Sequence, residues 1–111
     1  MMTVVEILTK ARSLIETKGH TKGAYARDAN GVKLEWNHPH ATCYCLMGAV
    51  NCVADNILRR DTAHSTTRRA IHARSGLWQT PDEYNDLKET TKQDVLDVLD
   101  AAIELAKAEA S

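Results

Sequence analysis

Apolar side chains recur at helical spacing from the first residues of the chain. The repeat predicts a helix over residues 3–18 with one apolar face. That face consists of Val4, Leu8, Ala11 and Ile15. Thr3 is the expected N-cap, because Glu6 follows three residues later at the spacing of a capping box. Gly19 follows the last helical residues and is expected to end the helix.

The apolar run after residue 41 predicts a second helix that begins near Thr42. Its apolar face consists of Leu46, Ala49, Val50, Val53 and Ile57. Gly48 interrupts this helix, and glycine costs about 1 kcal/mol relative to alanine in a helix interior. We therefore expect Gly48 to allow another backbone segment to come close.

Two further helices are predicted, with a short helix start between them. A thin apolar stripe predicts a third helix over residues 62–75, ending at Gly76. That stripe consists of Ala63, Thr67, Ala70 and Ile71. Thr80 and Pro81 mark the start of a short helix, since threonine caps and proline fits the first turn.

The last helix has the most regular apolar face. Its start is marked by a capping box, either Thr90 with Gln93 or Thr91 with Asp94. The face consists of Val95, Val98, Leu99, Ala102, Ile103 and Ala106. We expect it to pack on the second predicted helix, and the residues expected to be buried together are Leu46, Val50, Val53, Val95, Leu99 and Ile103.

Residues 19–40 lack helical periodicity. The segments 25–27 and 32–36 alternate around Asp28-Ala-Asn-Gly31, whose Asn-Gly pair accepts a positive φ. A small β-hairpin is predicted here.

The fold class is therefore α+β and mostly α, with three to four helices and a hairpin insertion between the first and second, in a single domain over residues 1–111.

Charge and cysteine content narrow the function classes. The formal net charge is −1, which does not favour binding to nucleic acid or to an anionic membrane. No apolar run is long enough to span a bilayer, and no basic-then-apolar leader is seen. Three cysteines, an odd number, then indicate a cytoplasmic protein with reduced thiols. No cofactor is expected, and the oligomeric state is not determined by the sequence.

Four ordered motifs carry a resemblance to a known family. They are Lys22-Gly-Ala-Tyr-Ala-Arg-Asp-Ala-Asn-Gly31, Cys45-Leu-Met-Gly-Ala-Val50, Tyr84-Asn-Asp86 and Thr91-Lys-Gln-Asp-Val95. The chain resembles a family of small uncharacterised bacterial and phage proteins, a domain of unknown function. It departs from the family pattern at His20 and Tyr84, where that pattern has or often has tryptophan. The resemblance implies a phage or prophage origin and the fold, but no activity.

The segment 38–45 contains side chains that bind metals. His38, His40, Cys43 and Cys45 are ligand types that suit zinc, although their spacing matches no common zinc signature. The alternative interpretation is loop histidines beside small buried thiols, and we favour it. We expect Cys45 and Cys52 to be mostly buried, reduced and free of metal.

Cys45 is also a candidate nucleophile. If Thr42 caps the helix, Cys45 lies in the first turn, where the helix dipole lowers a thiol pKa. A cysteine enzyme would need a base and an orienting group, and His20, Asn85 and Asp86 are available. Burial against the apolar face would instead make the thiol inert. For Asn85 and Asp86 the simpler interpretation is local turn chemistry before Thr90.

One side of the third predicted helix carries a candidate binding surface. It consists of Arg60, His64, Arg68 and His72, each four residues from the next. Such a row can hold phosphates or an acidic protein surface, but a solvated face, or pairing with the acidic last helix, is the simpler interpretation. The sequence thus favours a small non-enzymatic interaction or regulatory protein with an unknown protein partner. The alternative is a cysteine-dependent enzyme or metal-binding domain that uses residues 38–45.

Overall fold

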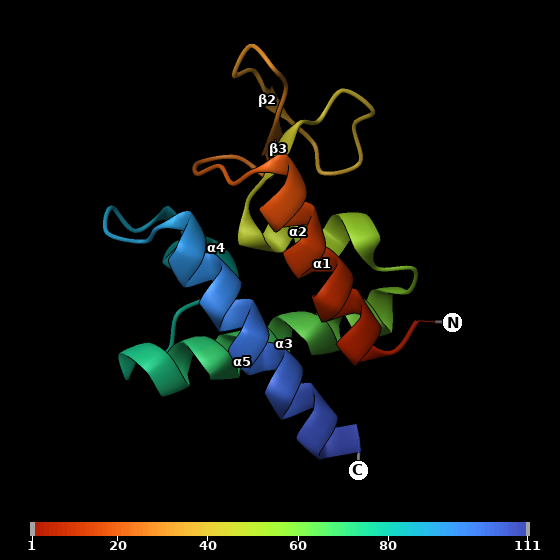
Figure 1. Cartoon of the computed structure of the whole chain (residues 1–111), viewed down its shortest axis with the longest axis vertical. Helices are drawn as coiled ribbons and strands as arrows, with labels where there is room; N and C mark the ends of the chain where they lie inside the picture. Colours follow the sequence, from red (N-terminus) through yellow and green to blue (C-terminus); the bar gives the residue numbers. More distant parts are fainter. Residues whose placement is uncertain (1, 111) are drawn as a thin grey trace.

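The computed structural model describes residues 2–110, within which five helices surround a core and a small sheet extends from one end (Figure 1). The elements are α1 (Val4–Lys18), β1 (Ala26–Arg27), β2 (Lys33–Leu34), β3 (Cys43–Tyr44), α2 (Leu46–Val53), α3 (Ile57–Ser75), α4 (Pro81–Asp86) and α5 (Lys92–Ala110). The mostly helical class is as predicted. The prediction of three to four helices was wrong, because the short segment that begins after Thr80 forms a separate capped helix, α4, and brings the number to five.

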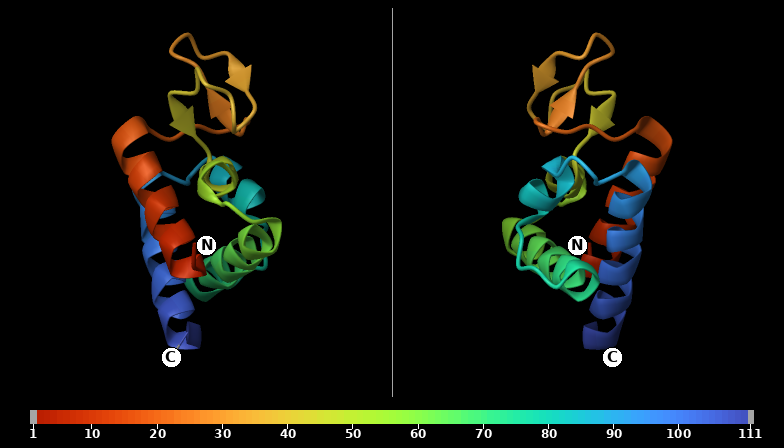
Figure 2. Two further views of the ribbon diagram at one scale, coloured as in Figure 1. Left: turned by 90° about the vertical axis from the view of Figure 1, so that its right-hand side faces the viewer. Right: turned by 90° about the vertical axis from the view of Figure 1, so that its left-hand side faces the viewer.

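The helical core has two layers. α1 and α5 lie side by side, and α3 crosses them on the opposite side with α2 and α4 (Figure 2). Leu8, Ile71 and Leu99 are fully buried where these helices meet. Of the six residues predicted to be buried together, five are buried and Val53 packs against the core while partly exposed. The expectation that the last helix packs on the second was wrong, because α5 packs mainly on α1 and α3.

Local capping sets the ends of three helices as the sequence predicts. Thr3 and Glu6 form a capping box at α1, and Gly19 ends that helix. Thr80 caps α4, with proline in its first turn. At α5 the second of the two predicted boxes forms, since the Thr91 N–H donates to Asp94 Oδ2 at 2.9 Å and the Asp94 N–H to Thr91 Oγ1 at 3.1 Å.

The junction between α2 and α3 differs from the prediction. The second helix does not begin near Thr42 or reach Ile57, and it covers only Leu46–Val53. Asn56 is the reason, because its Oδ1 accepts hydrogen bonds from the N–H groups of Leu58 and Arg59 and starts α3 five residues earlier than predicted. Ile57 therefore begins α3 and is exposed.

The hairpin also differs in position from the prediction. Its strands are two residues each, and β1 is the centre of a three-stranded antiparallel sheet with the order β2-β1-β3. Ala26 pairs with both Leu34 and Tyr44. The third strand consists of Cys43 and Tyr44, for which the apolar pattern predicts a helix. Pairing on both sides of β1 gives the small sheet a stability that an isolated hairpin lacks.

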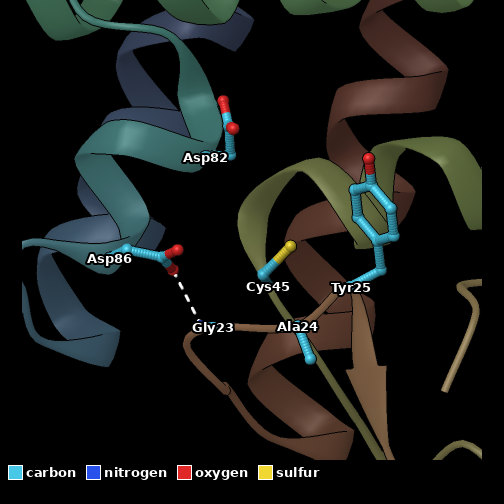
Figure 3. Close-up of a pocket in the computed structure, with 6 residues that line it drawn as sticks. All are labelled: Gly23, Ala24, Tyr25, Cys45, Asp82 and Asp86. Carbon is cyan, nitrogen blue, oxygen red and sulfur yellow. Dashed lines mark hydrogen bonds between the residues drawn. The ribbon is translucent and has the colours of Figure 1, made fainter. Parts of the chain in front are cut away.

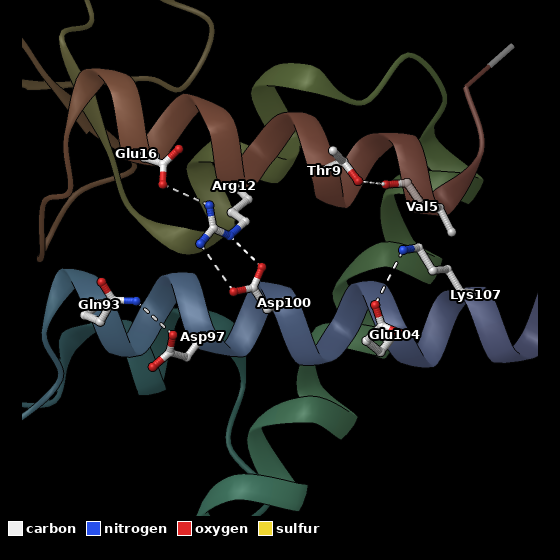
Figure 4. A network of polar contacts seen from close by, with 9 residues as sticks. All are labelled: Val5, Thr9, Arg12, Glu16, Gln93, Asp97, Asp100, Glu104 and Lys107. Carbon is white, nitrogen blue, oxygen red and sulfur yellow. Dashed lines mark hydrogen bonds and ion pairs between the residues drawn. The ribbon is translucent and has the colours of Figure 1, made fainter.

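Polar contacts connect α1 with α5 along the surface (Figure 4). The guanidinium of Arg12 pairs with Glu16 in its own helix at 3.0 Å and with Asp100 of α5 at 2.6 Å. Within α5, Gln93 donates to Asp97 and Lys107 pairs with Glu104. Across residues 2–110, none of the helices combines the length and apolar character needed to cross a membrane.

Candidate functional site

A pocket of about 220 Å³ opens where α4 faces the segment before β1 and the start of α2 (Figure 3). Its lining residues are Gly23, Ala24, Tyr25, Cys45, Asp82 and Asp86. The two aspartates come from α4 and lie on one side, Tyr25 lies on the other, and Cys45 lies between them. The pocket thus combines two carboxylates, an aromatic ring and a thiol.

Backbone contacts fix Cys45 in this pocket. Its N–H donates to the carbonyl of Tyr25 at 3.0 Å, and its Sγ accepts the Gly48 N–H at 3.1 Å as the N-cap of α2. A Cβ at Gly48 would lie 2.1 Å from the Tyr25 carbonyl oxygen. Gly48 therefore lets the segment before β1 lie against α2, as predicted from its place in an apolar helix.

The Cys45 thiol is neutral in this environment. The residue is 3% exposed, and burial raises the pKa of its thiol to about 11. Hydrogen bonds from the Gly48 and Met47 N–H groups act to lower the pKa, and the charges of Asp86 and Asp82 act to raise it. The helix N-terminus thus does not produce the low-pKa thiol of the nucleophile hypothesis, because burial has the larger effect.

Asn85 connects three segments behind the pocket. Its side chain is fully buried, its Oδ1 accepts the Leu46 N–H at 3.0 Å, and its Nδ2 donates to the Thr21 carbonyl at 3.0 Å. Oδ1 also lies 2.7 Å from Nε2 of His20, so that nitrogen is the donor. These bonds reach distant parts of the chain, and the turn interpretation of Asn85 was wrong.

Asp86 and His20 complete this polar network. Asp86 Oδ1 accepts the Gly23 N–H at 3.0 Å and so fixes the pocket wall, again a distant contact and not local turn chemistry. Burial lowers the pKa of His20, against the hydrogen bond to Asn85, which raises it. Of the four residues of the nucleophile hypothesis, Cys45 and Asp86 line the pocket. Asn85 contacts both Asp86 and His20 from behind it. Within residues 2–110, however, no hydrogen bond joins His20 to Cys45 Sγ, so His20 is not placed as its base.

The alternative metal ligands are not brought together. His38 Nδ1 accepts the His40 N–H, and Cys43 Sγ points to the Arg27 carbonyl at 3.9 Å. Cys45 is buried at the start of α2. In the part of the chain that the structure describes, no three His, Cys, Asp or Glu side chains form a group able to hold a metal ion.

The predicted binding row on α3 divides into two parts. His64 is directed inward, with Nε2 2.7 Å from Asn51 Oδ1, and Arg60 lies 3.7 Å from Asp61. Arg68 and His72 lie at the other end of the helix. There they contact Trp78, which follows α3 and belongs to no periodic pattern that would predict this contact.

Comparison with known proteins identifies the family of this chain. A model described as "Family of unknown function (DUF6197)" matches residues 1–105. The chain belongs to the DUF6197 family. A search of curated proteins and a search of solved structures found no match. Since the DUF6197 description gives no activity, the interpretation of the pocket rests on its geometry.

Proposed function

We propose that the chain is a non-enzymatic interaction protein whose pocket beside Cys45 recognises a cationic side chain of a partner protein. One observation carries the proposal. Asp82 and Asp86, one helical turn apart on α4, line the side of the pocket opposite Tyr25 (Figure 3). Carboxylates and the face of an aromatic ring both attract an ammonium or guanidinium group.

The size of the pocket supports a side chain as its ligand. A volume of about 220 Å³ is smaller than sites for whole small molecules, which are roughly 300–1,000 Å³. The pocket is wide enough for the end of a lysine or arginine. A group presented by a partner would add contacts around the rim that a free cation lacks.

The state of the thiol supports binding over catalysis. A nucleophilic cysteine needs a thiolate near neutral pH, whereas the Cys45 pKa is raised to about 11. The nearby negative charges of Asp86 and Asp82 oppose the thiolate and favour a bound cation. The same two aspartates therefore argue against a cysteine enzyme and for a cation site.

The test is an NMR titration with methylguanidinium, with methylurea as the neutral probe of similar shape. We expect methylguanidinium to shift the amide signals of Gly23, Ala24 and Tyr25, and methylurea to leave them in place. Asp82→Asn should weaken the response, because it removes a charge while keeping an oxygen for the Thr80 hydroxyl. The control Glu104→Gln on α5 should respond like the wild type. Equal shifts with methylurea, or an unchanged response in Asp82→Asn, would reject the pocket as a cation site.

A further inference from the structure

A solvent-exposed aromatic cluster lies at the end of α3, outside the pocket. Trp78 is 58% exposed, and its ring stacks on His72 with centroids 3.9 Å apart and an angle of 8° between the planes. The Arg68 guanidinium carbon lies 5.8 Å from the centre of the same ring, and the neighbouring Leu77 is 60% exposed. We name these four residues, Arg68, His72, Leu77 and Trp78, the aromatic face.

The turn that carries Trp78 is held in one conformation. Gly76 ends α3 with a left-handed φ of 77°, and its N–H donates to the His72 carbonyl at 2.8 Å. The Leu77 N–H donates to Ser75 Oγ at 3.2 Å. With the ring also stacked on His72, Trp78 is ordered before any partner binds. Association then costs less conformational entropy than it would for a mobile tryptophan.

Arg68 differs from the other arginines in the second half of α3. Arg69 pairs with Glu109 at 2.5 Å, and Arg74 lies 4.0 Å from Asp94. Among residues 2–110, Arg68 has no carboxylate within ion-pair distance. Its guanidinium is exposed beside a large apolar ring and remains available for an acidic group.

We propose that the aromatic face docks an acidic segment of a partner protein. A carboxylate of that segment pairs with Arg68, and a neighbouring apolar side chain lies on Trp78 and Leu77. Aromatic residues and arginine are the types enriched at the centres of protein interfaces. This surface is separate from the pocket at Cys45 and takes a ligand of opposite charge.

The charges around the face favour a peptide over a nucleic acid. A base could stack on Trp78, but phosphate binding needs several cations and the chain has a net charge of −1. Within residues 2–110, Arg68 is the one arginine of this face without a carboxylate partner, and Glu83 lies close enough for the two charges to influence each other. One carboxylate of a peptide can pair with Arg68, whereas the several phosphates of a nucleic acid would also lie near the negative charge of Glu83.

The test uses short probes in calorimetric titrations with the full chain. The probes are a soluble peptide of glutamates and leucines, the same peptide with glutamines for the glutamates, and an oligothymidylate. We expect the acidic peptide to bind and the glutamine peptide to bind much more weakly. Arg68→Gln should weaken binding about threefold or more, and Trp78→Ala about tenfold or more.

Matched variants distinguish this face from general charge and general apolar contact. Arg74→Gln removes an arginine of the same helix that already lies beside Asp94, and Leu58→Ala removes an exposed apolar side chain elsewhere. Both should bind the acidic peptide like the wild type, and circular dichroism checks that every variant is folded. No binding of the acidic peptide, equal binding of the glutamine peptide, tighter binding of oligothymidylate, or unchanged binding in Arg68→Gln and Trp78→Ala would each overturn the proposal.

Discussion

Gly48 is the residue at which one added carbon has the clearest consequence. An alanine Cβ would lie 2.1 Å from the Tyr25 carbonyl oxygen, and the same oxygen accepts the Cys45 N–H, so moving it away from α2 would strain that bond. Overpacking of this kind costs about 1–3 kcal/mol, which opposes the gain of about 1 kcal/mol in helix propensity. We expect Gly48→Ala to be less stable than the wild type in urea unfolding.

A matched substitution separates packing from propensity in that experiment. Ser65→Ala also places alanine within a helix, but at an exposed position of α3. Its free energy of unfolding should stay within about 0.5 kcal/mol of the wild type or rise slightly. A Gly48→Ala protein as stable as the wild type would show that the backbone contact does not constrain this position.

Cys45 gives a prediction about reactivity. Because burial holds its pKa at about 11, the thiolate is scarce at neutral pH. Iodoacetamide should therefore modify Cys45 slowly in the folded protein at pH 7, faster as the pH approaches 11, and fast in denaturant. Peptide mass spectrometry measures this rate, with the less buried Cys43 and Cys52 as references in the same sample. Rapid modification of Cys45 at pH 6 would restore the nucleophile hypothesis.

At the scale of elements, the sequence predicted helices better than the points where they join. Thr3, Thr80 and Thr91 define helix starts through contacts three residues apart, and such contacts are visible in the sequence. Ile57 misled the prediction because its spacing also fits the apolar face of α2. The Asn56 cap places Ile57 at the start of α3 instead of the end of α2. The apolar spacing alone does not distinguish these two positions.

The contact between α2 and α3 predicts a dependence of stability on pH. Burial, followed by the charge of Arg60, lowers the His64 pKa to about 4, compared with about 6.5 in an unfolded chain. The unfolded state then binds more protons between these values. Stability is therefore complete above about pH 6.5 and falls as the pH decreases toward 4, by up to about 3 kcal/mol. The lowered pKa of His20 acts in the same direction.

Urea unfolding at several pH values tests this prediction. His64→Gln keeps a polar group near Asn51 but cannot bind the proton, so its stability should fall less between pH 7 and pH 4.5. NMR titration of the His64 ring measures the pKa directly. Equal pH dependence in both proteins, or a ring that titrates near pH 6.5, would contradict the burial argument.

At the scale of the whole molecule, the core depends on α5. Leu99 is fully buried in the cluster to which α1, α2 and α3 contribute. Leu99→Ala should lower the free energy of unfolding by about 2–5 kcal/mol. Leu58→Ala is the control, because Leu58 is 73% exposed and its loss should cost less than about 0.5 kcal/mol. A loss below 1 kcal/mol in Leu99→Ala would show that the last apolar face is not the core.

The candidate site could be predicted only as separate residues. Cys45, His20, Asn85 and Asp86 were selected for their chemical types, but no local pattern indicated that they meet. Their contacts join segments 65 and 39 positions apart. The burial of Asn85 and the raised pKa of Cys45 both arise from that long-range packing. The stacking of Trp78 on His72 depends on how α3 ends at Gly76. Hydrophobic periodicity does not predict the direction of the chain after a helix end.

The buried amide of Asn85 also has a consequence for synthesis on the ribosome. Asn85 leaves the ribosomal exit tunnel well after the three residues whose polar groups it binds, His20, Thr21 and Leu46. Until Asn85 follows, the Leu46 N–H and the Thr21 carbonyl have only water to bind, which favours an open arrangement of this region. The start of α2 and the segment before β1 should thus acquire their final positions only after α4 has left the tunnel. A nascent chain that stops before α4 would lack both carboxylates of the pocket and the side chain that organises it.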